Sequence, residues 1–283
     1  MHNAVLHDNL RATVENLAGH AELSPSVVDD FADAFLTALE QGAIRAAEPR
    51  SDGTWHVNQW VKQGILLLFR AGRLRSMPPP YEHFFDKHTL PVRMLSAEDG
   101  VRLVPGGSAI RRGAYVAAGV ICMPPMYINI GAYVDEGTMV DSHALVGTCA
   151  QIGKRVHISA AAQIGGVLEP ASALPVIVED EAFIGGNAGV YEGVRVRSRA
   201  VIAAGVVLTA SVPVYDLVHE RIFRGSSDHP LEIPAGAVVI AGTRTLASSS
   251  FAREHGLAAS CALIVKYRDD RTDARTALEE ALR

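Results

Sequence analysis

Residues 127–164 read YINIGAYVDEGTMVDSHALVGTCAQIGKRVHISAAAQI, and an apolar residue returns at every sixth position of this stretch. The same phase runs back to Val104 without a break. It resumes after a short insertion at residues 170–175, and again after a longer interruption at residues 215–232, and we expect both segments to be loops. The positions that share the phase are Val104, Ile110, Val116, Cys122, Ile128, Val134, Val140, Val146, Ile152, Ile158 and Ile164, then Val178, Ile184, Val190, Val196, Ile202, Leu208 and Val214, and finally Ile233 and Val239.

A period of six fits neither the repeat of an α-helix nor the alternation of a simple strand. It fits a solenoid in which each hexapeptide forms one short strand and a corner, with its apolar residue pointing into the interior. Three hexapeptides then close a coil of about eighteen residues. Such hexapeptide coils wind left-handed, against the usual right-handed rule for parallel connections. We therefore predict a mainly β chain whose central domain, residues 101–245, is a left-handed parallel β-helix of hexapeptide repeats.

The flanking regions have different patterns. Residues 1–100 are expected to form an N-terminal helical domain. One helix should begin at Ser24-Pro25 and end before Gly42, because Ser is a good N-cap, Pro suits the first turn and Gly suits the residue after a helix. A second should cover about Asn58 to Arg70 and be buried on nearly all sides. Residues 246–283 are expected to hold a strand at residues 261–267 and an amphipathic helix at residues 272–283.

Composition narrows the possible functions. The chain has 283 residues, a net charge of −5 and 20% charged residues, so we expect no general attraction to nucleic acid or to an anionic membrane. Its three cysteines, Cys122, Cys149 and Cys261, are far apart. They form no disulfide framework and no metal-binding cluster, and we expect a cytoplasmic protein. Residues 114–134 are uncharged, but their prolines, glycines and short period argue against a membrane helix.

Three segments resemble a known family: Tyr127–Asp141, Gly147–Ser159 and Ile164–Pro170. They are similar to the tetrahydrodipicolinate N-succinyltransferases, the hexapeptide-repeat acyltransferases of lysine and diaminopimelate biosynthesis. Shorter segments agree, including residues 59–62, 84–87, 233–239 and 262–266. The resemblance implies a homotrimer with active sites between subunits. It also implies acyl-CoA as co-substrate, an amino-dicarboxylate acceptor and no metal.

Acylation of an amine requires a neutral amine, a group that takes its proton and donors that meet the developing oxyanion. The resemblance places Asp141 as the catalytic residue and Arg102 as a partner of an acceptor carboxylate. A turn residue and a surface arginine are the alternatives, and His157 is either a base or a residue on the coil face. The residues expected at the acceptor are Arg102, Asp141, Asn129, His143, Asn187 and Gly189. Those expected at acyl-CoA are Gly185, Gly186, Ala204 and Gly205 through the backbone, and Arg244 and Lys266 at the phosphates.

The chain departs from the family at three of these positions. The family usually has Arg where this chain has Asn187, a glutamate thought to be catalytic where it has Gly189, and Trp where it has His143. These changes favour an acyltransferase with an altered acceptor, such as lysine with acetyl-CoA, as in tabtoxin-type biosynthesis. The standard N-succinyltransferase reaction is the alternative, and a non-catalytic metabolite-binding solenoid is a second one. A hexapeptide-repeat carbonic anhydrase would need a third histidine beside His143 and His157.

Overall fold

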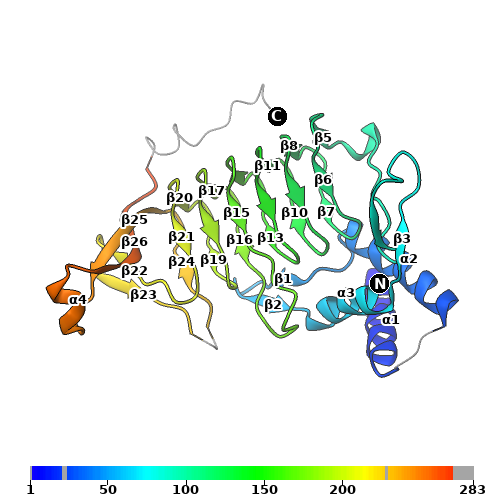
Figure 1. The fold of residues 1–283 in the computed structure, drawn as a ribbon, viewed down its shortest axis with the longest axis horizontal. Coiled ribbons are helices and arrows are strands. Elements are labelled where there is room, and N and C mark those ends of the chain that lie inside the picture. The colour runs from blue at the N-terminus through cyan, green and yellow to red at the C-terminus, as the bar shows by residue number, and fades with distance from the viewer. Residues whose placement is uncertain (1, 21–23, 227–228, 270–283) are drawn as a thin grey trace.

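The centre of the molecule is a three-sided prism of stacked coils (Figure 1). The computed structural model describes residues 2–20, 24–226 and 229–269. Tyr133 pairs in parallel with Tyr115 on one side and with Gln151 on the other, so each coil is eighteen residues long, as predicted. The predicted parallel β-helix of hexapeptide repeats is therefore confirmed.

Each side of the prism is one parallel sheet of two-residue strands. The long face contains β5 (Arg102–Leu103), β8 (Ile121–Cys122), β11 (Met139–Val140), β14 (His157–Ile158), β17 (Phe183–Ile184) and β20 (Val201–Ile202). The third face contains β6 (Ala109–Ile110), β9 (Tyr127–Ile128), β12 (Leu145–Val146), β15 (Gln163–Ile164), β18 (Gly189–Val190) and β21 (Val207–Leu208). The covered face contains β7 (Tyr115–Val116), β10 (Tyr133–Val134), β13 (Gln151–Ile152), β16 (Ile177–Val178), β19 (Arg195–Val196) and β24 (Glu232–Ile233).

The hexapeptide phase forms the core of the prism. Val134, Val140 and Val146, one from each face, are each 0% exposed. They belong to a single hydrophobic cluster that runs from the first coils to Val239. The exception is Val104, which was expected to point inward. The structure pairs Leu103 with Cys122 instead, so the register of the first strand is shifted by one residue.

The first interruption is an insertion into a coil, as predicted. Gln151 pairs with Ile177 instead of a residue eighteen positions further on, so the chain between them contains extra residues. The insertion is fastened to the helical domain by Lys62, whose ammonium group donates a hydrogen bond to the carbonyl of Ala173. Lys62 is fully buried, and this burial lowers the pKa of its ammonium group.

The second interruption was expected to be a loop, but it holds a hairpin. β22 (Val214–Asp216) and β23 (Arg221–Phe223) pair antiparallel. β22 also pairs with β26 (Ala258–Tyr267), which confirms the strand predicted at residues 261–267. β26 pairs in turn with β25 (Ala237–Thr245), which continues the long face beyond β20. A short helix, α4 (Ser250–Glu254), which was not expected, connects them, and the predicted helix at residues 272–283 lies outside the described residues.

The N-terminal domain contains α1 (His2–Ala18), α2 (Pro25–Glu40) and α3 (Gln59–Ala71). The two predicted helices are confirmed, with Pro25 in the first turn of α2 and Gly72 after α3. Residues 72–100, which were expected to belong to a helical domain, contain no α-helix. They contain the hairpin of β3 (Leu74–Ser76) and β4 (Phe85–Lys87), followed by the single turn η1 (Ala97–Asp99). No described helix is long and apolar enough to cross a membrane, and residues 114–134 form coil strands.

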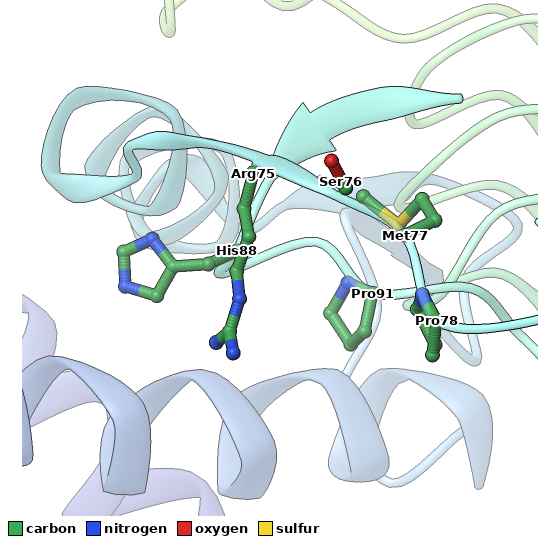
Figure 2. A pocket seen from close by; sticks show the side chains of 6 residues that line it. All are labelled: Arg75, Ser76, Met77, Pro78, His88 and Pro91. Atoms are coloured by element: carbon green, nitrogen blue, oxygen red, sulfur yellow. The ribbon is translucent and has the colours of Figure 1, made fainter. Parts of the chain in front are cut away.

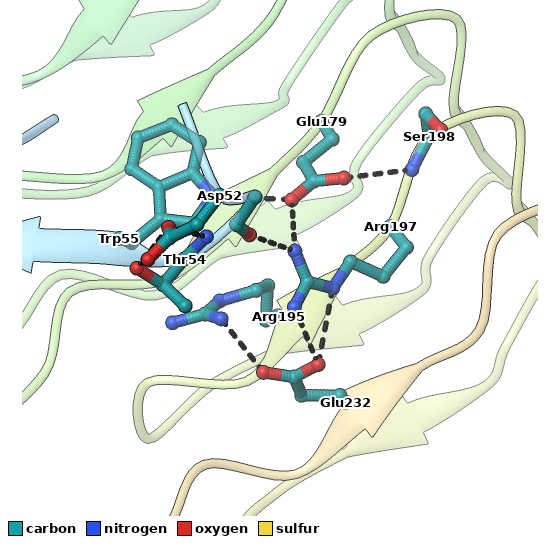
Figure 3. Close-up of polar contacts among 9 residues, drawn as sticks. Asp52, Thr54, Trp55, Glu179, Arg195, Arg197, Ser198 and Glu232 are labelled. Carbon is teal, nitrogen blue, oxygen red and sulfur yellow. Dashed lines mark hydrogen bonds and ion pairs between the residues drawn. The ribbon is translucent and has the colours of Figure 1, made fainter. Parts of the chain in front are cut away.

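A second hairpin fastens this domain to the covered face. It consists of β1 (Ala47–Pro49) and β2 (Trp55–Val57), and it lies along the coils (Figure 1). The indole N–H of Trp55 donates to Glu179, and Arg197 bonds Glu179, Glu232 and the carbonyl of Gly53 (Figure 3). The domain is thus joined to the coil by hydrogen bonds as well as by apolar packing.

Candidate active site

Most of the predicted site residues lie along one edge of the prism. This edge, called the first corner, is where each coil turns from the long face to the third face. It consists of residues 123–126, 141–144, 159–162, 185–188 and 203–206 in successive coils. The first corner brings together Asp141, His143, Gly185, Gly186, Asn187, Ala204 and Gly205.

Successive turns of the first corner are joined by a ladder of backbone hydrogen bonds. The N–H of His143 donates to Pro125 at 2.5 Å, and the N–H of Asn187 donates to Ala160 at 3.0 Å. His143 and Asn187 both have positive φ, 62° and 55°, at the same place in their turns. His and Asn tolerate this conformation better than most side chains. The repeated turn therefore points both side chains outward, and both are exposed.

Three backbone donors at this corner are left for a ligand. The N–H groups of Ala160, Gly186 and Ala204 donate no hydrogen bond to any described residue. Gly185 is needed because the next turn is very close: a Cβ at this position would lie 2.7 Å from the carbonyl carbon of Ala203 and 2.8 Å from the oxygen of Ile202. The glycines and alanines thus keep the surface low enough for a ligand to approach the peptide groups.

Asp141 is half-buried at the start of its turn. One carboxylate oxygen accepts a hydrogen bond from the N–H of Ser142 at 2.7 Å. The other oxygen makes no hydrogen bond among the described residues, which leaves it to accept one from a ligand. In the next coil, the Gln163 amide donates to the carbonyls of His143 and Ala161 at 3.3 and 3.2 Å and braces the turn that follows Asp141.

Gly189 has a neighbour that sequence reasoning missed. It is buried at the start of β18, and a Cβ on it would lie 2.9 Å from Cζ and 3.0 Å from the hydroxyl oxygen of Tyr191. The ring of Tyr191 therefore fills the space that a side chain at position 189 would need. The spacing of the two residues was the available signal, because side chains two apart on a strand point to the same side.

Besides Gly189, four predicted residues lie away from the first corner. Asn129 is on the next edge, between the third and covered faces, and accepts a hydrogen bond from the N–H of Ile130. Arg102 is exposed on β5, two strands from β11. The ammonium group of Lys266 pairs with Asp269 at 3.1 Å. Lys266 and Arg244 lie at opposite ends of the β25–β26 pair. Within one chain, the two residues predicted at the phosphates of acyl-CoA are therefore not neighbours.

A surface hollow of about 300 Å³ lies in the N-terminal domain, lined by Arg75, Ser76, Met77, Pro78, His88 and Pro91 (Figure 2). It contains none of the predicted site residues. Within the described ranges, no group of three His, Cys, Asp or Glu side chains is arranged to hold a metal ion.

Comparison with known proteins identifies the family. Residues 9–71 match the profile of the tetrahydrodipicolinate N-succinyltransferase N-terminal domain, and residues 175–210 match the hexapeptide repeat of succinyl-transferase. The chain is 47% identical over 272 residues to the 2,3,4,5-tetrahydropyridine-2,6-dicarboxylate N-succinyltransferase of Paraburkholderia phymatum, covering 93% of this chain and 94% of the relative. It is 41% identical to the Bradyrhizobium diazoefficiens protein of the same name over 99% of both chains. This chain belongs to the tetrahydropyridine-dicarboxylate N-succinyltransferase family.

Membership of this N-succinyltransferase family confirms that the chain is an acyltransferase. The fold agrees with a solved structure as well. A Campylobacter jejuni protein described as a 2,3,4,5-tetrahydropyridine-2-carboxylate N-succinyltransferase superposes with a TM-score of 0.53 at 17% identity. The match covers 90% of this chain and 65% of that one. The names of the relatives favour the standard reaction over the altered acceptor expected from the departures at positions 143, 187 and 189.

Proposed function

We propose that this enzyme transfers the succinyl group of succinyl-CoA to the amino group of an acceptor derived from tetrahydropyridine-2,6-dicarboxylate. The observation that carries the proposal is the identity of 41–47% with N-succinyltransferases of that name over at least 90% of the chain. The reaction places the enzyme in lysine and diaminopimelate biosynthesis, and a cytoplasmic location fits a supply of acyl-CoA.

The first corner supports each requirement of the chemistry. The oxygen of Asp141 that makes no hydrogen bond accepts one from the attacking amine and takes its proton as the C–N bond forms. The free N–H groups of Gly186 and Ala204 are donors for the thioester or pantetheine oxygens of the acyl-CoA. Collapse of the tetrahedral intermediate then expels CoA as a thiolate, which is protonated to the free thiol.

We also propose that the enzyme acts as a homotrimer with active sites between subunits. In one chain, Asn129 lies on a different edge from Asp141, and Arg102 lies on the long face. A neighbouring chain placed against the first corner supplies the missing side of the site. Residues 1–100, 101–245 and 246–283 remain our proposed division into domains.

A changed acceptor is the second candidate, and one observation favours it. The first corner, residues 123–126, 141–144, 159–162, 185–188 and 203–206, contains no Lys or Arg, and all of it is described. Carboxylates are usually bound by such cations, above all by the guanidinium fork of Arg. An acceptor with one carboxylate, such as lysine, needs fewer cationic partners at this corner than a dicarboxylate does. Acetyl-CoA would be the corresponding acyl donor.

A thiol-release assay separates these possibilities. Purified enzyme is given succinyl-CoA or acetyl-CoA with either the tetrahydropyridine dicarboxylate or lysine, and the release of CoA is followed with a thiol reagent. We expect the highest kcat/KM for succinyl-CoA with the dicarboxylate. Preference for lysine would establish the second candidate. Binding of CoA without turnover of any pair would instead indicate a non-catalytic solenoid.

A further inference from the structure

The ring of Tyr191 lies flat on the third face, across two glycines. A Cβ on Gly165 would lie 2.7 Å from ring carbon Cδ1, whereas a Cβ on Gly189 would meet the Cζ and hydroxyl end of the ring. Gly165 follows β15 and Gly189 begins β18, so the ring bridges two neighbouring coils. Because both positions lack a side chain, the ring has room to lie in this orientation.

This orientation points the phenol toward the first corner. Gly189, which lies under the hydroxyl end, is only two residues from Asn187 of that corner. The hydroxyl makes no hydrogen bond to any described residue, although Tyr191 is half-buried. The hydroxyl oxygen keeps some exposed surface, so a ligand can reach it. The phenol is thus a positioned donor beside the proposed acceptor site, at an edge that has no Lys or Arg.

We propose that Tyr191 is an acceptor-binding residue that donates its phenolic O–H to a carboxylate oxygen of the acceptor. The inference rests on the proposed function, and it holds for either acceptor because both contain a carboxylate. A hydrogen bond to an ionised acceptor is stronger than one between neutral groups. Gly165 and Gly189 are part of the same device, because a side chain at either position would displace the ring.

The first test removes only the oxygen. Tyr191→Phe is expected to raise the KM for the acceptor roughly ten- to a hundredfold, the loss typical of a hydrogen bond to a charged group. The KM for acyl-CoA and kcat should stay within about twofold. Tyr127→Phe is the matched control, because Tyr127 is also half-buried on the third face but lies three strands from β18. An unchanged acceptor KM in Tyr191→Phe, or an equal rise in Tyr127→Phe, would overturn the inference.

The second test moves the phenol without removing it. Gly189→Ala places a methyl group against the ring and should swing the hydroxyl away, so the acceptor KM should rise by about as much as in Tyr191→Phe. When the two changes are combined, the second should add little, since the hydrogen bond is already lost. Fully additive effects would show that the residues act separately and would count against the inference. Equal thermal unfolding midpoints establish that each variant is folded.

These outcomes can be told apart from failure of the proposed function. If the wild type turns over an acceptor and Tyr191→Phe does so with the same KM, the function stands and the inference falls. If no acyl-CoA is consumed, the function falls, and calorimetric titration of the dicarboxylate and of lysine then decides the role of Tyr191. At least tenfold weaker binding in Tyr191→Phe supports the role, whereas equal binding, or none in the wild type, overturns it.

Discussion

Asp141 and Asp135 make the same turn hydrogen bond on neighbouring edges of the coil. Each carboxylate accepts from the N–H of the following residue, at 2.7 and 2.8 Å, and each side chain is half-buried. They differ in position, since only Asp141 lies at the first corner. Because Asn keeps an oxygen that can accept the turn bond, replacing either residue by Asn should preserve the fold and isolate the chemical role of the carboxylate.

We therefore predict that Asp141→Asn lowers kcat about a hundredfold or more, the usual effect of losing a general base. The dissociation constant for CoA, measured by calorimetry, should remain within about twofold. Asp135→Asn is the control and should keep nearly full activity. If both variants keep wild-type activity, Asp141 has no part in proton transfer and its carboxylate serves only the turn.

The predicted residues that the structure brings together at the first corner came from the family resemblance, and the coil repeat explains why they share one edge. A coil of eighteen residues, lengthened once by the insertion before Ile177, carries position 141 to 159, 185 and 203, so the column of the first corner follows from counting. The same count places Asn129 on another edge. Tyr191 was missed because the repeat specifies which residues point inward but not how an outward ring leans over its neighbours.

At the scale of one element, a coil strand owes its stability to its inward residue. Ile158 is 0% exposed, whereas Val207, which begins a strand of the third face, is 50% exposed. Ile158→Ala should lower the free energy of unfolding by about 2–5 kcal/mol, through lost apolar burial and the cavity left behind. Val207→Ala should change it by less than about 1 kcal/mol. Urea unfolding followed by circular dichroism measures both changes in the free energy of unfolding. Equal losses would contradict the claim that the inward residue stabilises the strand.

Elements outside the repeat were harder to predict. Val214 keeps the hexapeptide phase and is buried, but the chain has already left the coil and pairs there with β23 and β26. Apolar periodicity reports burial, and it does not report which partner provides it. Val104 keeps the hexapeptide phase, but Leu103 rather than Val104 pairs with the buried Cys122. Val104 follows the first strand, β5, which has a neighbour on only one side, so β8 alone sets the register.

The hairpin of β22 and β23 is tied to β26 through one buried carboxylate. Burial opposes ionisation of Asp216, but Tyr267 at 2.7 Å, His219 at 2.9 Å and two backbone N–H groups donate to it. These bonds outweigh the burial and bring the pKa of Asp216 from 3.8 to about 2. Because the folded pKa is below the unfolded one, this stabilisation is fully present above about pH 4 and is lost as the pH falls toward 2.

We therefore predict a specific pH profile for Asp216→Asn. Its thermal unfolding midpoint should lie below that of the wild type by a constant gap between pH 7 and pH 5, and the gap should narrow as the pH falls below about 4. Differential scanning calorimetry at several pH values measures the gap. Asp180→Asn, at an exposed coil corner, serves as the comparison. A gap that stays constant down to pH 3 would show that the charge of Asp216 contributes nothing to folding.

At the scale of the whole molecule, the helical domain and the coil are joined by the cluster around Arg197. Its guanidinium group bonds two carboxylates and a hairpin carbonyl, so Arg197→Ala leaves Glu179 and Glu232 without that partner. We expect a loss of about 1–3 kcal/mol in the free energy of unfolding. Arg199→Ala, on an exposed side chain 3.6 Å from Glu181, should cost less than about 1 kcal/mol. Equal losses in urea unfolding would show that the bonds of Arg197 hold the two parts together no more strongly than an exposed ion pair.

The separation of Asn129 from Asp141 on different edges of one coil leads to a test of shared active sites. If each site takes Asp141 from one chain and Asn129 from its neighbour, an Asp141→Asn chain and an Asn129→Ala chain are each inactive alone but complementary. Random mixing then gives about one site in four with both native residues, so a refolded or co-expressed mixture should recover about a quarter of wild-type activity.

Light scattering should show three chains of 30.2 kDa in each sample. If the mixture is no more active than its parts while Asn129→Ala alone is inactive, both residues act from the same chain. The site would then have to be formed without a neighbour.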